Sequence, residues 1–188
     1  MIREYLQSFN ILTSSEIDDF LALCTPREMN KGDFFIQEGK ICREVAFVNS
    51  GIVRTFFTQE SGEEVTYCIT FPGALLTAYS SYITAQPTVE NIQAITAVEL
   101  LVIPKAPLTA LTQSSVNWIT FLKIMAEQQY IELEKRLLLF QKEKARKRYQ
   151  DLLTHQPDYI RQIPLQYLAS YLGITARHLS RLRKEILL

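Results

Sequence analysis

The chain has 188 residues, of which 47% are apolar and 21% are charged, with 20 basic and 20 acidic side chains. Ten Phe and nine Tyr exclude a disordered chain, because disordered segments are poor in aromatic residues. No apolar run reaches the roughly 18 residues of a membrane span, and the N-terminus shows no secretory signal pattern. We therefore expect a cytoplasmic protein without a membrane partner. Three scattered cysteines (Cys24, Cys42 and Cys68) fit a reducing compartment, and we expect them to be small buried side chains.

The charge is distributed unevenly along the chain. Residues 1–139 carry a net charge of −6, and residues 140–188 carry a net charge of +6. A basic terminal segment attracts polyanions such as nucleic acids. The alternative is a solvated helix face, and the charge alone does not decide between the two.

The first hundred residues change from a helical to a strand pattern. Residues 1–23 predict two short amphipathic helices, the second capped by Ser14 or Ser15. From residue 27 to residue 103, short runs of β-branched and aromatic residues alternate with turn signals, which predicts a sandwich, barrel or jelly roll. The clearest predicted strands are 45–49, 52–58, 64–70 and 97–103.

After Pro107 the pattern is helical to the end of the chain. A helix over 116–140 would be about 37 Å long. One of its faces carries a stripe of mostly apolar residues: Leu122, Ala126, Gln129, Leu133, Leu137 and Phe140. A small sandwich cannot cover that length, so we expect the stripe to meet a second copy of itself. The alternative is a helix packed on its own barrel.

Residues 163–182 have the pattern of a helix-turn-helix. Ala169 is small where two helices would cross, and Gly173 can adopt the positive φ of a helix C-terminus. Thr175 is a favoured N-cap for the second helix, whose Leu179 and Leu182 would face inward. An ordinary helical hairpin is the alternative.

The second helix of this motif carries a basic face. Arg177, Arg181 and Lys184 point away from its apolar side, where a major groove would receive them. We predict a set of DNA-binding residues in this segment: Thr175, Ala176, Arg177, His178, Ser180, Arg181, Lys184 and Lys147. Lys144 and Arg148 are flanking candidates.

The succession of strands, long helix and helix-turn-helix resembles the Crp/Fnr family of bacterial transcription regulators over nearly the whole chain. Two segments carry family-like marks: Lys31–Gly39 (KGDFFIQEG) and Phe47–Arg54 (FVNSGIVR). The resemblance implies an α+β protein with an N-terminal double-stranded β-helix, a jelly roll like the cyclic-nucleotide-binding domain. A dimerisation helix and a C-terminal helix-turn-helix would follow. The expected domains are 1–112, 113–141 and 142–188.

The chain departs from the family in the segment that binds cyclic nucleotides. Family members that bind them share a Gly-Glu-Leu and a later Arg-Ser, whose Glu, Arg and Ser hold the ribose and the phosphate. Ungapped alignment puts Ala78 at the Glu, Thr88 at the Arg and Val89 at the Ser. A charge-assisted hydrogen bond contributes about 1.5–3 kcal/mol, so we expect no response to cyclic AMP. Ala78, Tyr79, Thr88 and Val89 then form a degenerate effector pocket.

Other sensor chemistries of the family also lack their ligands here. An iron–sulfur cluster needs about four cysteines, and a haem would need an axial His or Cys in the roll, whereas both histidines, His155 and His178, lie in the C-terminal region. We therefore predict no cofactor and no metal site. The roll interior, near Tyr67 and Tyr82, either holds a small apolar effector or is filled by its own side chains.

The sequence predicts a homodimeric DNA-binding transcriptional regulator, with RNA polymerase and an unknown small effector as further candidate partners. Relatives commonly have a β-hairpin wing after the recognition helix, and this chain has no full wing, so we expect weaker DNA binding. No GxSxG, P-loop or HExxH motif is present, and we predict no enzyme. The alternative function is a β-roll ligand-binding or dimeric scaffold module whose helix-turn-helix does not read DNA.

Overall fold

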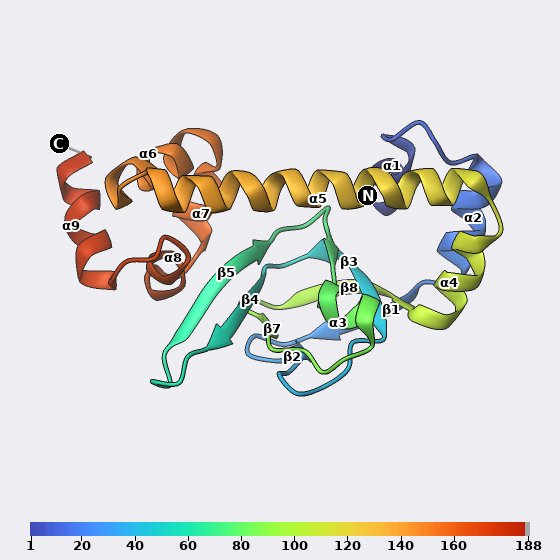
Figure 1. Ribbon diagram of the computed structural model, residues 1–188, viewed down its shortest axis with the longest axis horizontal. Helices are drawn as coiled ribbons and strands as arrows, with labels where there is room; N and C mark the ends of the chain where they lie inside the picture. Colours follow the sequence, from blue (N-terminus) through green and yellow to red (C-terminus); the bar gives the residue numbers. More distant parts are fainter. Residues whose placement is uncertain (187–188) are drawn as a thin grey trace. The chain divides into compact units, whose positions relative to one another are not determined.

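A computed structural model describes residues 1–186 of the chain (Figure 1). The last two residues of the predicted DNA-binding domain, 187–188, lie outside the described residues. The helices are α1 (Ile2–Gln7), α2 (Ser14–Ala22), α3 (Tyr79–Thr84), α4 (Lys105–Gln113), α5 (Val116–Lys142), α6 (Ala145–His155), α7 (Pro157–Gln162), α8 (Leu165–Tyr171) and α9 (Ala176–Ile186). The strands are β1 (Thr25–Met29), β2 (Phe34–Ile36), β3 (Glu44–Ser50), β4 (Val53–Thr58), β5 (Glu64–Thr70), β6 (Leu75–Leu76), β7 (Asn91–Ala94) and β8 (Val98–Pro104).

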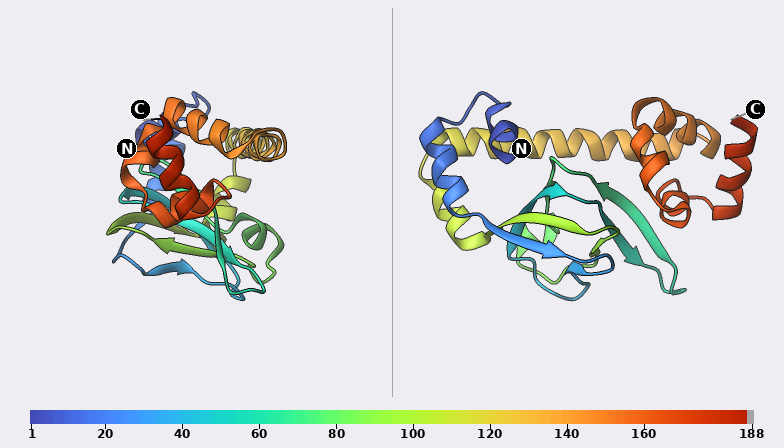
Figure 2. Two further views of the ribbon diagram at one scale, coloured as in Figure 1. Left: turned by 90° about the vertical axis from the view of Figure 1, so that its left-hand side faces the viewer. Right: turned by 180° about the vertical axis from the view of Figure 1, so that it is seen from behind.

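The described residues fall into two compact units. The N-terminal unit comprises Met1–Phe57 and Ile69–Glu127, and the C-terminal unit comprises Thr58–Cys68 and the chain from Gln128 onward. Helix α5 is one unbroken helix in the right view of Figure 2, and it contributes residues to each unit. The division into 1–112, 113–141 and 142–188 stays a prediction.

Two antiparallel sheets form the roll, with strand orders β1-β8-β3-β6 and β2-β7-β4-β5. The turn that leads from β3 in the first sheet to β4 in the second depends on Gly51, whose φ is +81°. A Cβ at this position would lie 2.1 Å from the carbonyl oxygen of Ala97, so only glycine fits. The fold class is confirmed, and all four clearest strands are present.

The interior of the roll is filled by its own side chains. Buried residues from both sheets meet in one core, including Val48 and Leu100 from the first sheet and Val53 and Ile92 from the second. Tyr82 packs against this core from α3. Of the three cysteines, Cys42 is buried, Cys24 is half-buried and Cys68 is exposed, so the expectation that all are buried is wrong for Cys68.

A second core joins the N-terminal helices to the start of α5. Trp118 and Phe121, on the first turns of α5, are buried against α1, α2 and Phe47. The rings of Phe20 and Trp118 stack with centroids 5.4 Å apart, and Phe9 meets Phe121 edge-on at 5.0 Å. The first two turns of α5 are therefore anchored in the N-terminal unit.

Glu16 connects the start of α2 to the start of α5. Thr13, and not Ser14 or Ser15 as predicted, caps α2 in a reciprocal capping box with Glu16. The Glu16 carboxylate also accepts hydrogen bonds from the Ser115 hydroxyl and from Asn117 Nδ2, the latter at 3.1 Å. The bond from Ser115 and the backbone bond from Thr13 lower the pKa of Glu16 to about 2.

Among the described residues, no helix is long and apolar enough to cross a membrane.

We expect Glu16→Gln to destabilise the protein by about 1 kcal/mol at neutral pH, because the charge-assisted hydrogen bonds become neutral ones. Since the pKa of Glu16 is lower in the folded chain than the ordinary 4.5, its contribution is complete above pH 4.5 and falls as the pH drops towards 2. The free energies of unfolding of the variant and the wild type, measured with urea, should therefore differ by a constant amount above pH 4.5 and converge as the pH falls from 4.5 towards 2. Asp19→Asn is the control, and a gap that stays constant over this range would contradict the prediction.

Candidate nucleic-acid interface

Helices α8 and α9 form a helix-turn-helix. Leu172 ends α8, and Gly173 follows with φ +66°, so the positive φ predicted from the sequence is present. The Thr175 hydroxyl accepts a hydrogen bond from the His178 amide at 3.2 Å, which is the predicted N-cap of α9. Leu179 and Leu182 are buried. The turn and the start of α9 are therefore stabilised by Gly173 and Thr175, as the sequence predicts.

The recognition helix, α9, presents a basic face to solvent. Arg177, Arg181 and Lys184 are exposed and follow one another at spacings of four and three, which places them on one side of the helix. The other predicted contacts lie around them: Thr175, Ala176 and Lys147 are exposed, and His178 and Ser180 are half-buried. Their arrangement on exposed surface fits a groove-facing element.

Two other basic residues of this region are occupied within the protein. Arg183 is half-buried and donates a hydrogen bond to the carbonyl oxygen of Ile160 at 3.3 Å. Arg146 pairs with Glu185 at 3.6 Å. Neither guanidinium is as free to meet a phosphate as the exposed Arg177 and Arg181.

Arg148 has a structural role that the sequence did not reveal. Its guanidinium donates to the carbonyl oxygens of Leu172 at 2.9 Å and Glu143 at 2.6 Å, which closes the C-termini of α8 and α5. It also lies 4.6 Å from the ring centre of Phe140. Its Nε, Nη1 and Nη2 atoms all donate inside the unit, and the interpretation of Arg148 as a flanking DNA contact stays a prediction.

A stack of arginines and aromatic rings fastens α8 to the end of α5. Arg136 lies 4.0 Å from the ring centre of Tyr171 and donates to the Tyr171 carbonyl at 3.2 Å. Phe140, on the same helix, receives both Arg136 and Arg148 on its ring. A Cβ on Gly173 would lie 2.9 Å from this ring, so a larger residue would have to displace Phe140 and also adopt a positive φ.

Two tyrosines complete the interior of the C-terminal unit. The rings of Tyr159 and Tyr171 are 5.2 Å apart, and burial raises the pKa of both phenols well above the ordinary value. On the other side of α8, Ser170 accepts a hydrogen bond from the Thr66 amide at 2.9 Å and donates to the Glu64 carbonyl at 3.1 Å. Helix α8 is thus held by contacts on several sides, and α9 is left with the exposed face.

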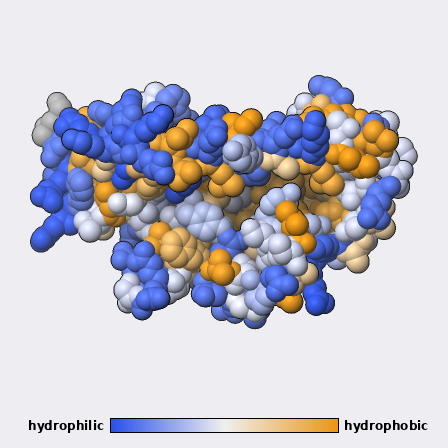
Figure 3. Space-filling view, viewed as in Figure 1, coloured by the Kyte–Doolittle hydropathy of each residue, from blue (hydrophilic) through white to orange (hydrophobic). Residues whose placement is uncertain are grey.

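The predicted dimer stripe is mostly uncovered. Leu122, Ala126, Gln129, Leu133 and Leu137 are exposed, whereas Phe140 is half-buried by the arginine stack. Two exposed residues missed from the sequence, Ile119 and Tyr130, extend the stripe. Ile119, Ala126, Leu133 and Phe140 follow one another at intervals of seven, which is a heptad position and could have been read from the sequence. Figure 3 shows hydrophobic residues at several points along α5, between hydrophilic ones.

The degenerate effector pocket does not come together as one cavity. Ala78 is buried in the roll core, whereas Tyr79 and Val89 are exposed, Val89 by 77%. Thr88 is buried and its backbone is paired, because its amide donates to the Lys40 carbonyl and its carbonyl accepts from the Gly39 amide, both at 2.8 Å. No side chain at these four positions presents a cation to a phosphate.

Among residues 1–186, no three His, Cys, Asp or Glu side chains gather as a ligand set for a metal ion.

Comparison with known proteins agrees with this architecture. Residues 26–115 match the family model of the cyclic nucleotide-binding domain. A similar solved structure is the catabolite activator protein of Thermus thermophilus, with 25% identity and a TM-score of 0.59, covering 94% of this chain and 84% of that one. The chain has the fold of the Crp/Fnr regulators. The resemblance predicted from the sequence is confirmed.

Two further solved structures show the same Crp/Fnr fold at lower identity. FixK2 of Bradyrhizobium japonicum is 18% identical with a TM-score of 0.73, covering 87% of this chain and 84% of that one. A protein described as a transcriptional regulator of the Crp/Fnr family from Eubacterium rectale is 16% identical with a TM-score of 0.75, covering 98% and 88%. The similar structures named here are thus described as regulators and not as enzymes. A comparison with curated protein sequences gives no match.

We expect Arg148→Met to lower the free energy of unfolding of the C-terminal unit by about 1–3 kcal/mol, because the carbonyls of Leu172 and Glu143 lose their donor. Lys147→Met removes the same charge from an exposed neighbour and should change stability by less than about 0.5 kcal/mol. Thermal unfolding followed by circular dichroism distinguishes the two. Equal melting temperatures for both variants would show that the Arg148 contacts add no stability.

Proposed function

We propose that this protein is a dimeric transcriptional regulator that reads DNA through α9 and does not respond to cyclic AMP. The observation that carries the proposal is the exposed basic face of α9, formed by Arg177, Arg181 and Lys184. The remaining arginine of α9, Arg183, donates to the Ile160 carbonyl within the protein. An Arg side chain can donate two hydrogen bonds to O6 and N7 of guanine in the major groove. Recognition without catalysis is the activity that such a face supports.

The dimer follows from α5. The stripe from Ile119 to Leu137 leaves large apolar side chains in solvent, and Leu133 and Tyr130 are exposed by 60% and 66%. A helix that buries such residues against a copy of itself gains about 25 cal/mol for each Å² of apolar surface removed from water. Two copies would also bring two recognition helices together, which binding to a two-fold-symmetric operator requires. RNA polymerase stays a predicted partner.

The competing candidate is a dimeric scaffold or ligand-binding module. It would keep the roll and the α5 stripe but use α9 only as a solvated surface. Its discriminating property is the absence of base preference, because a solvated basic face attracts all DNA through its phosphates alone.

We expect Arg181→Ala to relax base preference at one position of each half-site, by about 1–3 kcal/mol of discrimination. Lys147→Ala, which removes a predicted phosphate contact, should weaken binding to all sequences and reduce its salt dependence. The measurement uses DNA duplexes that the wild type selects from a random-sequence pool. The affinities of the wild type and the variants for these duplexes are titrated at several salt concentrations. Lys31→Ala, which removes an exposed charge from the N-terminal unit, is the control.

If Arg181→Ala and Lys147→Ala both matched the wild type in specificity ratio and salt slope, the regulator proposal would be overturned and the scaffold candidate would stand.

We expect Leu133→Glu to convert the dimer to monomers, because each partner would place a carboxylate in an apolar seam. Gln128→Glu adds the same charge at an exposed position of α5 off the stripe and should leave the dimer intact. Sedimentation velocity of the wild type and both variants measures the change. A wild-type protein that sediments as a monomer at tens of micromolar would contradict the prediction.

We expect cyclic AMP and cyclic GMP to show no saturable binding at micromolar concentrations. Ala78, Thr88 and Val89 provide no carboxylate to accept a hydrogen bond from the ribose and no cationic side chain to donate to the phosphate. Calorimetric titration of the wild-type protein is the test. A dissociation constant in the low micromolar range would show that the nucleotide is held by other residues and that the alignment of this segment is wrong.

A further inference from the structure

An open cavity of about 430 Å³ lies on the N-terminal unit, beside the loop that joins β2 to β3. Its volume falls in the range of small-molecule sites. Its walls come from β2, from the loop 37–43 and from the end of β8 at Pro104. None of the four positions of the degenerate effector pocket lines it, so the cavity is separate from the place where the family fold holds a nucleotide.

The cavity combines apolar walls with unpaired positive charge. Phe34 and Ile41 leave 40% and 39% of their surface in solvent beside the buried Phe35. Lys40 and Arg43 also line the cavity, and both side chains are exposed without a hydrogen-bonding or ionic partner among residues 1–186. An apolar wall beside two free cations is complementary to an amphipathic anion.

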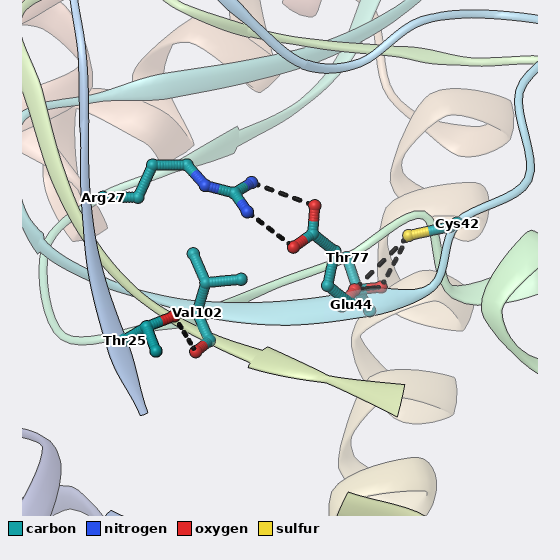
Figure 4. A network of polar contacts seen from close by, with 6 residues as sticks. All are labelled: Thr25, Arg27, Cys42, Glu44, Thr77 and Val102. Atoms are coloured by element: carbon teal, nitrogen blue, oxygen red, sulfur yellow. Dashed lines mark hydrogen bonds and ion pairs between the residues drawn. The ribbon is translucent and has the colours of Figure 1, made fainter. Parts of the chain in front are cut away.

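The carboxylate of the lining residue Glu44 does not cancel this charge. Arg27, which is not a lining residue, donates to both oxygens of Glu44 at 2.9 and 2.7 Å, as Figure 4 shows. This bidentate pair neutralises Glu44 and fixes its direction. The Arg27 guanidinium also lies 5.8 Å from the ring centre of Phe35, one of the lining residues. Lys40 and Arg43 are therefore left as net positive charge at the cavity.

The backbone around the cavity is fixed before any ligand arrives. The Arg43 carbonyl accepts a hydrogen bond from the Lys105 amide at 2.7 Å, and the Lys40 amide donates to Gln37 at 3.2 Å. Cys42 is buried between them, and its amide donates to the Ser81 hydroxyl at 2.9 Å. Its thiol contacts Thr77 Oγ1 at 3.3 Å, also drawn in Figure 4. A rigid loop lowers the ordering cost of binding.

The same loop is bonded to the segment that holds the degenerate effector pocket. Thr88 pairs with Gly39 and Lys40, and Ser81 on α3 accepts from Cys42. A ligand that contacts Lys40 therefore touches a loop whose hydrogen bonds lead to α3 and Thr88, without entering the filled roll core.

We infer that this cavity is a binding site for a small organic carboxylate with an aromatic or short aliphatic body. The body lies against Phe34, Phe35 and Ile41, and the carboxylate is held by Lys40 and Arg43. The site does not depend on DNA binding, and the two proposals can fail separately.

The test is calorimetric titration of the full chain with 4-phenylbutyrate, with the uncharged 4-phenylbutan-1-ol as the matched ligand. We expect saturable binding of one carboxylate per chain and at least tenfold weaker binding of the alcohol. Lys40→Met and Arg43→Met, which keep apolar stems, should each weaken the carboxylate about tenfold, the order expected for one charge-assisted contact. Lys31→Met, which removes a cation that does not line the cavity, should bind as the wild type does.

Methyl chemical shifts locate the ligand. Shifts at Ile36 and Ile41 support the site, whereas shifts confined to Leu133 and Leu137 on α5 would place the ligand on the exposed stripe and overturn it. Failure to saturate at 10 mM, or an unchanged affinity in the Lys40→Met/Arg43→Met double variant, would also overturn it. Sequence-specific DNA binding by these two variants is expected to persist, so its loss or retention speaks only to the proposed function.

Discussion

Helix α5 carries more apolar surface than the described chain covers. Trp118 and Phe121 are buried in its first turns, and Phe140 in its last turns is partly covered by Arg136 and Arg148. Between them, Leu133 and Tyr130 stand in solvent. Exposed apolar rows of this kind are uncommon on monomers and mark an interaction surface. The proposed dimer, and with it the pairing of two recognition helices, depends on this one imbalance.

The arginines of the C-terminal unit divide into two groups by the chemistry around them. Arg136, Arg148 and Arg183 donate to backbone carbonyls near helix ends, and Arg136 and Arg148 also pack on aromatic rings. A planar guanidinium with several donors is better suited to such contacts than an ammonium. Arg177 and Arg181 face solvent from the first half of α9. The net charge of +6 carried by residues 140–188 is therefore partly structural, and the share left for a nucleic acid is smaller than that charge implies.

Two of the four positions predicted as a degenerate effector pocket are taken up by contacts within the roll. Ala78 packs in the roll core, where an acidic side chain would have needed a partner. The backbone amide and carbonyl of Thr88 are hydrogen-bonded to the loop 37–43. Lys40 and Arg43 instead lie at a different cavity, beside an apolar wall. For this reason the inferred carboxylate site is placed at that cavity and not at the four positions predicted as the degenerate effector pocket.

The sequence by itself determined the order of elements and the helix-turn-helix, because these follow from local chemistry: alternating strands between turn signals, Gly173 at positive φ and Thr175 as an N-cap. It also placed the stripe of α5, which needs only helical periodicity. It could not assign Arg148, since the Leu172 carbonyl that binds it is 24 residues away, nor the Thr13–Glu16–Ser115 network, whose ends are about a hundred residues apart. The cavity beside Lys40 likewise exists only where β2, the loop 37–43 and the end of β8 meet. Contacts between distant segments depend on how the chain packs, and packing is what only the tertiary structure decided.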